Sequence, residues 1–498
     1  MDFRFADAMS RLPDYLGNHV LVSFTALVIG LAASLPLALL SLRRPILRNL
    51  LLTATSIVQT IPGLALLALF YPLLLGVAAI CESTFGFSFS ALGFLPAVLA
   101  LALYSMLPVV RNTITGLMSI EPAIRKSAAG VGMTPQQSLR MVELPLALPV
   151  IMAGVRTASV WVIGTATLST PIGQTSLGNY IFIGLQTQNW IFVLFGCVSA
   201  AVLALAVDQM LALMESGYSG RRRWRVATGA AGFAAILLVS LLPLVGQERS
   251  AYTIGSKTFA EQYILANLLE RRLEAAGLSA RRTNGLGSAV VFEALVSGEV
   301  DAYVDYTGTI WTNQMKRTDV KPRADVLAGV EAWLEKTYNV KVLGALGFEN
   351  AYSLAVSAKR AQQDGLKTIA DLASVAPDMT IAGDYEFFGR PEWRSIRDTY
   401  GLRFRNQRLM QAEFMYQAAG AGEVDVISAY TSDGRIAKFD LKVLEDPRQA
   451  IPPYDAILLV SAKRSADKAF MAALAPLVGA IDVSVMREAN ARASDGAS

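Results

Sequence analysis

The chain changes character at a cluster of arginines, RRRWR at residues 221–225. The sequence before it is almost free of charge, with about ten of the 44 Lys and Arg residues and about eight of the 40 Asp and Glu residues. One more apolar run follows at residues 226–245, and the remainder has the charge density of a soluble protein. A basic cluster followed by about 20 apolar residues predicts a transmembrane helix whose basic end lies in the cytoplasm. The sequence therefore predicts a membrane-embedded half tethered to a soluble half on the external side of the membrane.

Composition excludes several classes of function. With 53% hydrophobic residues, the chain is too apolar for a soluble enzyme, and its net charge of +4 comes largely from the arginine cluster, which gives no support for nucleic acid binding. The single histidine, His19, and the two cysteines, Cys81 and Cys197, all precede residue 221. The soluble half therefore lacks the residues for common zinc sites, Cys nucleophiles and Ser-His triads, and we expect no catalytic residue, metal site or cofactor. No GxxxxGK[ST] motif occurs, so any ATP hydrolysis belongs to another subunit.

Six apolar runs predict transmembrane helices at residues 20–42, 50–75, 92–110, 150–168, 191–213 and 226–245. Lys and Arg gather after the first run, between the third and fourth, and after the fifth, so these loops are predicted to be cytoplasmic. We expect an α-helical polytopic domain of about six spans in the cell (inner) membrane, comprising a membrane-embedded part at 1–218 and a tether with the last span at 219–248. The external domain follows at 249–498. Arg156 is a charge within the fourth run and either serves gating or snorkels to the interface.

The loop between the third and fourth runs carries two short helical stretches within residues 120–149, separated by Gly130 and Gly132. Two amphipathic helices on a cytoplasmic surface suit docking into a groove of a partner, although an amphipathic surface loop without a partner is the alternative. The segment resembles the coupling loop of ABC importer permeases, with Lys126 where their pattern has Glu. The resemblance implies contact with a cytoplasmic ABC ATPase through Lys126, Ser127, Ala128, Gly132, Val142, Leu144 and Pro145.

Two stretches of the soluble half echo each other about 124 residues apart: EALVSGEVDAYVDYTG at 293–308 and YQAAGAGEVDVISAYTSDG at 416–434. Each runs from a helix end through Gly-Glu-Val-Asp into an apolar strand that ends in Tyr-Thr. Such strands are typical of buried parallel sheets, whose carboxyl ends bind ligands. The echo predicts an α/β domain of two lobes, with lobe one at about 249–356 and 454–498 and lobe two at about 357–453.

Six side chains of this domain are candidates for ligand binding. Four tyrosines lie at predicted strand ends or at crossovers between the lobes: Tyr306, Tyr352, Tyr430 and Tyr454. Several aromatic faces around one point hold a quaternary ammonium, each ring contributing about 0.5–2 kcal/mol when desolvated. Lys257, at a strand-to-helix turn, and Arg390, in DYEFFGRPEW, are placed to bind a carboxylate at the other end of the ligand. Taken singly, each of these residues is more often a packing or surface group. Beside Lys257, Thr258 and Glu261 have the spacing of a helix capping box.

The soluble half resembles the binding proteins for glycine betaine, choline and related compatible solutes. The similarity rests on GSKTFAEQYILANLL, VDYTGT, GDYEFFGRPE, VDVISAYTSDGRIAKFDLKVLEDP and PPYDA. It implies a two-lobed periplasmic-binding-protein-like fold of type II, a cage of the four tyrosines and a carboxylate clamp of Lys257 and Arg390. Two departures lie near the site: VDYTG where the family commonly has PEYTG, and EFFGRPEW where an EFYERP-like run is common.

Together the two resemblances imply a fused permease and substrate-binding subunit of an ABC importer. Its ligand would be a betaine-like quaternary ammonium osmolyte such as glycine betaine, choline or proline betaine, and its partners a second copy of this chain, two ATPase subunits and membrane lipid. The alternative within transport is ergothioneine, carnitine or another small zwitterion. A ligand-sensing receptor is disfavoured because the longest internal loop has only about 35 residues, and an external enzyme is disfavoured because no nucleophile motif is present.

Overall fold

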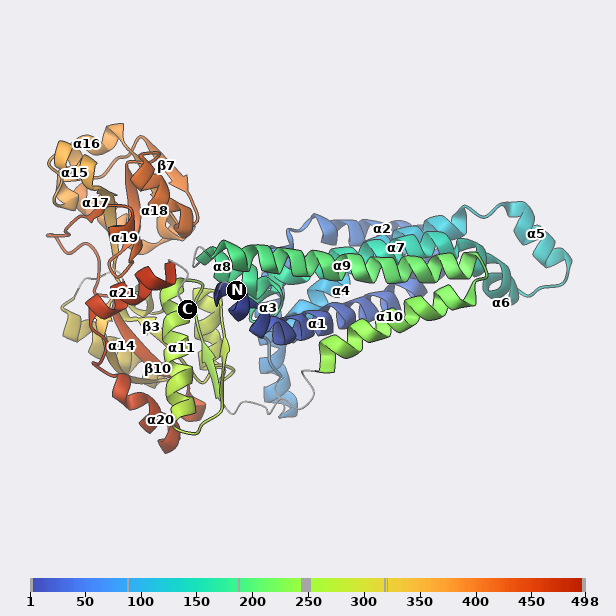
Figure 1. The fold of residues 1–498 in the computed structure, drawn as a ribbon, viewed down its shortest axis with the longest axis horizontal. Coiled ribbons are helices and arrows are strands. Elements are labelled where there is room, and N and C mark those ends of the chain that lie inside the picture. The colour runs from blue at the N-terminus through green and yellow to red at the C-terminus, as the bar shows by residue number, and fades with distance from the viewer. Residues whose placement is uncertain are drawn as a thin grey trace. The chain divides into compact units, whose positions relative to one another are not determined.

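The structure is a computed structural model of the 498-residue chain (Figure 1). It describes residues 3–86, 89–186, 189–242, 252–317, 319, 321–384 and 386–494. The chain forms two compact units: Met1–Phe182 with Ile191–Glu248, and Ile183–Trp190 with Arg249–Ser498. The last residues of the predicted tether, 243–248, lie outside the described residues.

The first unit is α-helical. Its longer helices are α1 (Phe3–Ser41), α2 (Pro45–Thr60), α3 (Gly63–Phe85), α4 (Phe94–Met118), α7 (Leu144–Ala166), α9 (Trp190–Ser219) and α10 (Arg223–Leu241), with the short α8 (Gly178–Gln186) between α7 and α9. Six helical segments among the described residues are long and apolar enough to cross a membrane, which confirms the predicted number of spans. Helix α4 packs against α1 and α7 at the centre of the unit. Gly154 on α7 permits the close approach of this helix to α4, since an added Cβ would lie 2.7 Å from the carbonyl oxygen of Pro108 on α4.

The predicted bounds of the second span, 50–75, are wrong. The chain leaves the helical conformation at Ile61 (φ −72°, ψ 127°), where the following proline, Pro62, disfavours the α region. Helix α2, with 16 residues, therefore ends before the break, and α3 is the apolar segment long enough to span.

Arg156 joins two helices of the membrane unit. Its Nε and Nη2 donate to the two carboxylate oxygens of Asp208 on α9, at 2.8 and 2.9 Å, and its Nη1 donates to Glu215 at 3.2 Å. The sequence left gating and snorkelling open, and the structure gives this charge two acidic partners on a neighbouring helix, the usual state of an intramembrane arginine.

The predicted coupling loop contains two short helices, α5 (Pro122–Gly130) and α6 (Pro135–Ser138). Gly132 turns the chain between them with φ +82°, a conformation that residues with a Cβ rarely adopt. Thr134 then caps α6 in a capping box with Gln137. The loop therefore has a defined conformation, in which the turn at Gly132 sets the orientation of α5 relative to α6.

The end of this loop runs directly into a membrane-spanning helix. A π-helical turn, Leu139–Glu143, continues α6 into α7, so that Leu144 and Pro145 begin the spanning helix rather than close a separate loop helix. On α5, Lys126 is exposed and Ala128 is buried.

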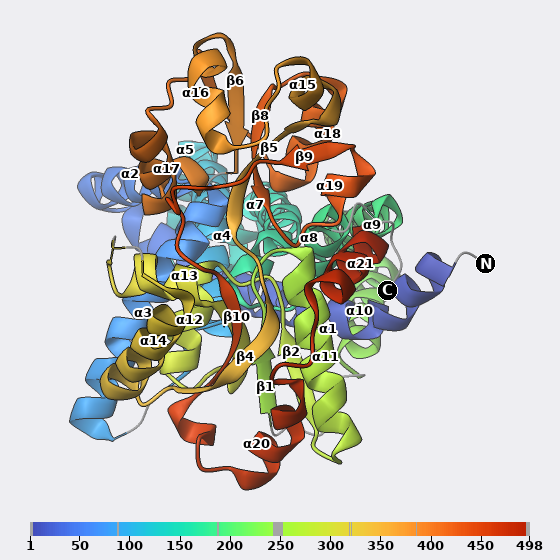
Figure 2. The same cartoon turned by 90° about the vertical axis from the view of Figure 1, so that its left-hand side faces the viewer.

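The second unit contains two five-stranded mixed sheets (Figure 2). In lobe one the order is β2 (Ala280–Thr283), β1 (Tyr252–Gly255), β3 (Ala302–Tyr306), β10 (Asp455–Val460) and β4 (Lys341–Glu349). In lobe two it is β7 (Asn406–Leu409), β6 (Thr380–Gly383), β8 (Val426–Tyr430), β5 (Tyr352–Ser357) and β9 (Leu441–Val443). The first three strands of each sheet are parallel, and the fourth is antiparallel to both neighbours. The two-lobed α/β fold is therefore confirmed.

Helices cover these sheets. Lobe one has α11 (Ala260–Ala275), α12 (Ser288–Val296), α13 (Thr307–Thr309), the π-turn η4 (Ile310–Gln314), α14 (Arg323–Tyr338), α20 (Lys468–Leu474) and α21 (Val483–Ser494). Lobe two has α15 (Ala358–Gln363), α16 (Leu372–Val375), α17 (Pro391–Tyr400), α18 (Ala412–Ala421) and α19 (Arg435–Lys438). The buried faces of strands and helices in both lobes form apolar cores, which need no disulfide.

The two echoing stretches occupy equivalent places in the two sheets. Asp301, before β3, accepts a hydrogen bond from the Thr253 N–H at 2.7 Å, and Asp425, before β8, accepts one from the Thr380 N–H at 2.8 Å. Each aspartate thereby holds the start of the neighbouring parallel strand, at the second residue of β1 and at the first residue of β6. This hydrogen bond explains why the Val-Asp pair is repeated. The strand that follows each aspartate ends in a tyrosine.

The chain enters lobe two earlier than the sequence suggested. Strand β4 pairs with β10 in the first sheet, and β5 pairs with β8 and β9 in the second, so residues 352–356 lie in lobe two. Only Asn350 and Ala351 separate the two strands. Because β4 and β5 are nearly continuous, the sequence gives no turn signal that would mark the crossing. The return segment ends at Tyr454, whose carbonyl accepts the Asn350 N–H at 3.0 Å.

Candidate ligand-binding cleft

A cavity of about 260 Å³ lies between the two lobes of the second unit. It is bordered by the turn after β1, the ends of β3 and β8, both crossings between the lobes and the start of α17. The structure brings all six predicted ligand-binding residues to its wall: Lys257, Tyr306, Tyr352, Arg390, Tyr430 and Tyr454.

The aromatic rings of the cleft lie close together. The ring centroids of Tyr352 and Tyr430 are 4.7 Å apart, and Tyr454 meets Tyr352 edge to face at 6.0 Å. Phe259 is a fifth ring that the sequence analysis missed: it lies nearly parallel to Tyr306 at 6.2 Å and to Tyr430 at 6.3 Å. Phe259 lies two residues after Lys257, in a turn that the sequence already predicts to face the cleft. Its position in this turn could therefore have predicted that its ring lines the cavity. The rings come from both lobes, so the cage is complete only when the lobes meet.

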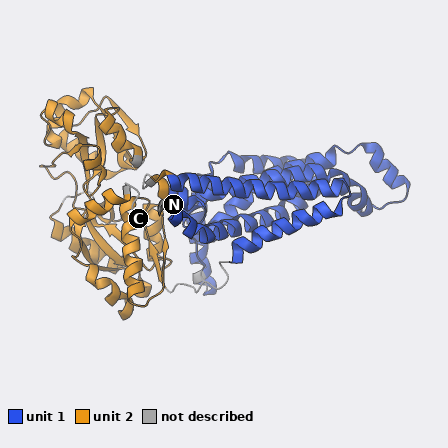
Figure 3. Cartoon of the chain, in the orientation of Figure 1, with its two compact units in different colours: residues 1–182, 191–248 blue, residues 183–190, 249–498 orange. Residues whose placement is uncertain are grey.

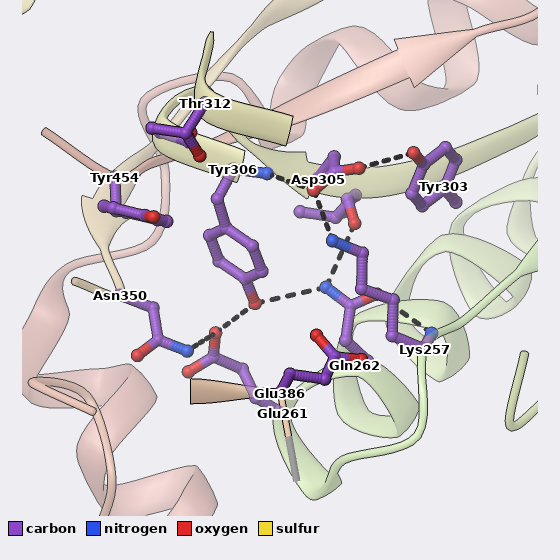
Figure 4. A network of polar contacts seen from close by, with 12 residues as sticks. Lys257, Glu261, Gln262, Tyr303, Asp305, Tyr306, Thr312, Asn350, Glu386 and Tyr454 are labelled. Atoms are coloured by element: carbon purple, nitrogen blue, oxygen red, sulfur yellow. Dashed lines mark hydrogen bonds and ion pairs between the residues drawn. The ribbon is translucent and has the colours of Figure 1, made fainter. Parts of the chain in front are cut away.

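The phenol groups are neutral and donate to acidic side chains. Burial raises the pKa of Tyr306, Tyr352, Tyr430 and Tyr454 well above the ordinary value for tyrosine. Three hydroxyls then donate to carboxylates: Tyr306 to Glu261, Tyr430 to Asp384 at 2.7 Å, and Tyr454 to Glu392. Figure 4 shows the first of these contacts. Negative charge therefore lies at the hydroxyl ends of the cage rings.

Arg390 presents unused donors at the cleft. Its side chain is 11% exposed, its Nη2 donates to Glu386 at 2.6 Å, and its Nη1 lies 3.6 Å from Glu392. The guanidinium carbon lies 5.2 Å from the ring centroid of Tyr352. Nε and Nη1 are buried and have no hydrogen-bond partner among the described residues. Buried donors without partners are costly, so these atoms suit an anionic group entering the cavity.

Lys257 has a partner within the protein. Its ammonium group forms an ion pair with Asp305, and the two side chains are 3% and 2% exposed. The Tyr306 N–H and the Tyr303 hydroxyl also donate to Asp305, as Figure 4 shows. Asp305 is the acidic residue of VDYTG, where the sequence departs from PEYTG. The sequence predicts that Lys257 binds a carboxylate of the ligand. In the structure, its ammonium group instead forms an ion pair with the buried carboxylate of Asp305.

Glu261 is a cleft residue that the sequence analysis assigned to another role. With Thr258 it has the spacing of a capping box, but α11 begins after Phe259 with no side-chain cap, and Glu261 lines the cavity. Its carboxylate accepts four hydrogen bonds, and burial nonetheless raises its pKa. Other polar residues at the wall had no local signal because they lie on five different segments: Asn350, Asp384, Gln411, Ser432 and Asn490.

Two family models match the chain. Residues 26–220 match the binding-protein-dependent transport system inner membrane component, and residues 250–498 match the substrate binding domain of the ABC-type glycine betaine transport system. The first match falls almost entirely in the membrane unit, and the second lies in the other unit (Figure 3).

Individual relatives cover one or both parts. An ergothioneine transport permease/ergothioneine binding protein of Helicobacter pylori (strain G27) is 30% identical over 429 residues, which are 83% of this chain and 74% of that protein. A choline transport system permease protein of Bacillus subtilis (strain 168) is 39% identical over 198 residues, 40% of this chain and 84% of that protein. A crystal structure of a glycine betaine/carnitine/choline ABC transporter is 27% identical, covers 50% of this chain and 93% of that one, and has a TM-score of 0.44.

These matches, together with the apolar helices, make the chain a multi-pass protein of the inner membrane whose binding domain is of an extracytoplasmic type. A transport subunit of this kind is not by itself an enzyme, and its family implies an ATPase partner and a small-molecule ligand. The chain belongs to the ABC importer family, as an inner-membrane permease fused to a substrate-binding domain of the glycine betaine transport type.

Proposed function

We propose that the binding domain captures a small quaternary ammonium zwitterion of the betaine class, and that the membrane unit carries it inward when a separate ATPase subunit hydrolyses ATP. One observation carries the proposal: the same cavity is bordered by five aromatic rings and by Arg390, two of whose N–H groups have no hydrogen-bond partner among the described residues. A quaternary ammonium offers no N–H to donate, so aromatic faces are its natural partners. A carboxylate on the same molecule would accept from the guanidinium.

The charges at the cavity wall also favour a cation. Four acidic side chains line the cavity against three basic ones: Glu261, Asp384, Glu386 and Asp433 against Lys257, Arg390 and Arg435. Each base has an acidic partner, since Lys257 pairs with Asp305, Arg435 with Asp433 and Arg390 with Glu386. Of the three, Arg390 alone keeps buried N–H groups without a hydrogen-bond partner among the described residues. The remaining field attracts a positive group and leaves Arg390 as the main partner of a negative one.

Ergothioneine is the second candidate. It too is a trimethylammonium zwitterion, and the Helicobacter pylori relative, which aligns with 83% of this chain, is an ergothioneine transport permease/ergothioneine binding protein. The wall also holds polar groups that a small betaine does not require: Gln411 lines it, and the Asn350 Oδ1 is buried without a hydrogen-bond partner among the described residues. Such groups suit a ligand with a further polar ring.

A titration of the full chain in lipid nanodiscs tests the ligand class. We expect glycine betaine, choline or ergothioneine to bind with micromolar affinity in calorimetry, and proline, which has no quaternary ammonium, to bind much more weakly. Tyr430→Ala should weaken binding by about 10- to 100-fold because it removes a desolvated ring that contacts two others. Tyr430→Phe, which keeps the ring, is the matched control and should lose less. Silence of the wild-type chain toward all four compounds would contradict the proposal.

We also propose that two copies of this chain assemble with two ATPase subunits, which contact the loop of α5 and α6. Support comes from the permease match, which includes this loop, and from its built turn at Gly132. The contact residues would be those aligned with the family pattern: Lys126, Ser127, Ala128, Gly132, Leu144 and Pro145.

Gly132→Val is expected to uncouple transport from ATP hydrolysis. Valine at φ +82° costs about 1–3 kcal/mol of backbone strain, so α5 and α6 would take another relative orientation. In proteoliposomes containing the ATPase, ligand-stimulated hydrolysis and uptake should fall about tenfold or more, while ligand affinity stays within about twofold. Gly130→Ala, at a neighbouring glycine with open space and no positive φ, should leave both activities unchanged. Normal uptake by Gly132→Val would refute the role of the loop.

A further inference from the structure

Two buried glutamates have matching positions and partners in the two lobes. Glu261 lies in the first turn of α11 in lobe one, and Glu392 lies in the first turn of α17 in lobe two. They are 3% and 1% exposed. Neither belongs to the predicted cage or clamp, so their burial calls for a separate explanation.

Glu261 joins a cage ring to the other lobe. Its Oε1 accepts from the Tyr306 hydroxyl and from Asn350 Nδ2 at 3.1 Å, as Figure 4 shows. Its Oε2 accepts from the hydroxyl of Ser432, which follows β8 of lobe two, and from Asn490 Nδ2 at 2.9 Å. Two of these donors are the Nδ2 groups of asparagine side chains, which donate hydrogen bonds and accept none. A protonated carboxyl would face them with a hydrogen of its own, so four donors suit the ionised carboxylate.

Glu392 makes the reciprocal connection from lobe two. Its Oε1 accepts from the Tyr454 hydroxyl and from Thr312 Oγ1 at 2.9 Å. Thr312 lies in η4 of lobe one, and Tyr454 directly precedes β10 of the same lobe. Its Oε2 has no hydrogen-bond partner among the described residues. Each glutamate thus holds the hydroxyl of one cage tyrosine and reaches a serine or threonine hydroxyl across the cleft.

Resting on the proposed function, we propose that Glu261 and Glu392 are positioning residues that set the preference for a cation, acting through Tyr306 and Tyr454 when the lobes are in contact. A carboxylate that accepts a phenol hydrogen raises the electron density of the ring and fixes its orientation, and its own charge adds attraction for a cation in a poorly screened site. When the lobes separate, each glutamate loses the hydrogen bond from the hydroxyl of the opposite lobe. A bound cation, attracted by both carboxylates, therefore favours the state in which the lobes are in contact.

The test compares cationic ligands with an uncharged-head analogue. Glycine betaine, choline and ergothioneine are titrated into the full chain in nanodiscs, together with tert-butylacetate, in which carbon replaces the ammonium nitrogen of glycine betaine. Glu261→Gln and Glu392→Gln should each weaken the cation that binds the wild type by about tenfold or more. The affinity of tert-butylacetate, measured directly or by competition, should change less than about threefold, because its head carries no charge. Glu270→Gln, on α11 but paired with Arg282 outside the cavity, is the matched control and should affect neither ligand.

A double-mutant cycle tests whether Glu261 acts through Tyr306. Tyr306→Phe keeps the ring and removes the hydroxyl, so Glu261→Gln combined with Tyr306→Phe should bind the cation little worse than Glu261→Gln alone. Additive losses would overturn the assignment, as would equal losses for the cation and tert-butylacetate. If a glutamine variant does not fold, Ser432→Ala and Thr312→Val each remove one opposite-lobe donor and should still weaken the cation by about threefold. A wild-type chain that binds none of the three cations contradicts the proposed function itself.

Discussion

Arg390→Ala is expected to weaken glycine betaine binding about 100-fold or more, while choline binds as tightly as before or more tightly. A carboxylate would take two charge-assisted hydrogen bonds from the Nε and Nη groups of this side chain, each contributing about 1.5–3 kcal/mol. Choline has no carboxylate, and its cation gains from the removal of a nearby positive charge. Calorimetric titration of both ligands into the full chain in nanodiscs measures the two changes side by side.

Arg397→Ala is the control for this variant. It lies on the same helix, α17, but its guanidinium is exposed and pairs with Asp398. Neither ligand should respond to it. If Arg390→Ala weakened choline as much as glycine betaine, the residue would serve to balance Glu386 and Glu392 within the protein, and the carboxylate-binding role would be refuted.

Lys257→Met is expected to lower the free energy of unfolding of the binding domain by about 3–5 kcal/mol. The substitution leaves Asp305 as a buried carboxylate without its cation, which costs far more than the loss of a surface ion pair. For a domain of this size, the midpoint in differential scanning calorimetry should fall by about 6–20 °C.

The double variant Lys257→Met/Asp305→Asn separates this explanation from ligand binding. With both charges removed, most of the lost stability should return, because the Tyr303 hydroxyl and the Tyr306 N–H still find an oxygen acceptor at residue 305. A single variant as stable as the wild type, with lost affinity for glycine betaine and unchanged affinity for choline, would instead support the carboxylate role that the family resemblance implies for Lys257.

The repeated motif made the architecture of the binding domain predictable. The chain around Tyr306 and Tyr430 carries its own helix end, its own turn and its own apolar strand, all within about 15 residues. Local signals of this kind do not depend on the rest of the fold. The end of a parallel strand is also a fixed place in such sheets, so each tyrosine could be assigned to the cleft before its neighbours were known.

The partners of these tyrosines could not be predicted in the same way. The Glu261 carboxylate meets Ser432 and Asn490, which are 171 and 229 residues away in the sequence. Which side chains meet across the cleft depends on the register of two sheets and on where the chain crosses between them. Locally, Glu261 has the spacing of a helix cap, and only the position of the opposite lobe gives it a different role.

A similar limit explains the bounds of the second membrane span. Hydropathy continues through Ile61 and Pro62, so a window of apolar residues joins two helices that the backbone separates. A proline disfavours the helical conformation of the residue before it, but Pro36 and Pro108 lie inside the unbroken helices α1 and α4. The sequence alone therefore does not tell which proline of an apolar segment ends a helix.

The two crossings between the lobes lie side by side, joined by the hydrogen bond from Asn350 to Tyr454. Two adjacent links leave the lobes little freedom except rotation about the line that contains them. Opening of the cleft is then a single coordinate, and one pair of spectroscopic labels, with one label on α14 and one on α18, would report all of it. Capture and release by a single molecule could be followed as a one-dimensional trajectory, whose dwell times measure directly how long each ligand keeps the lobes together.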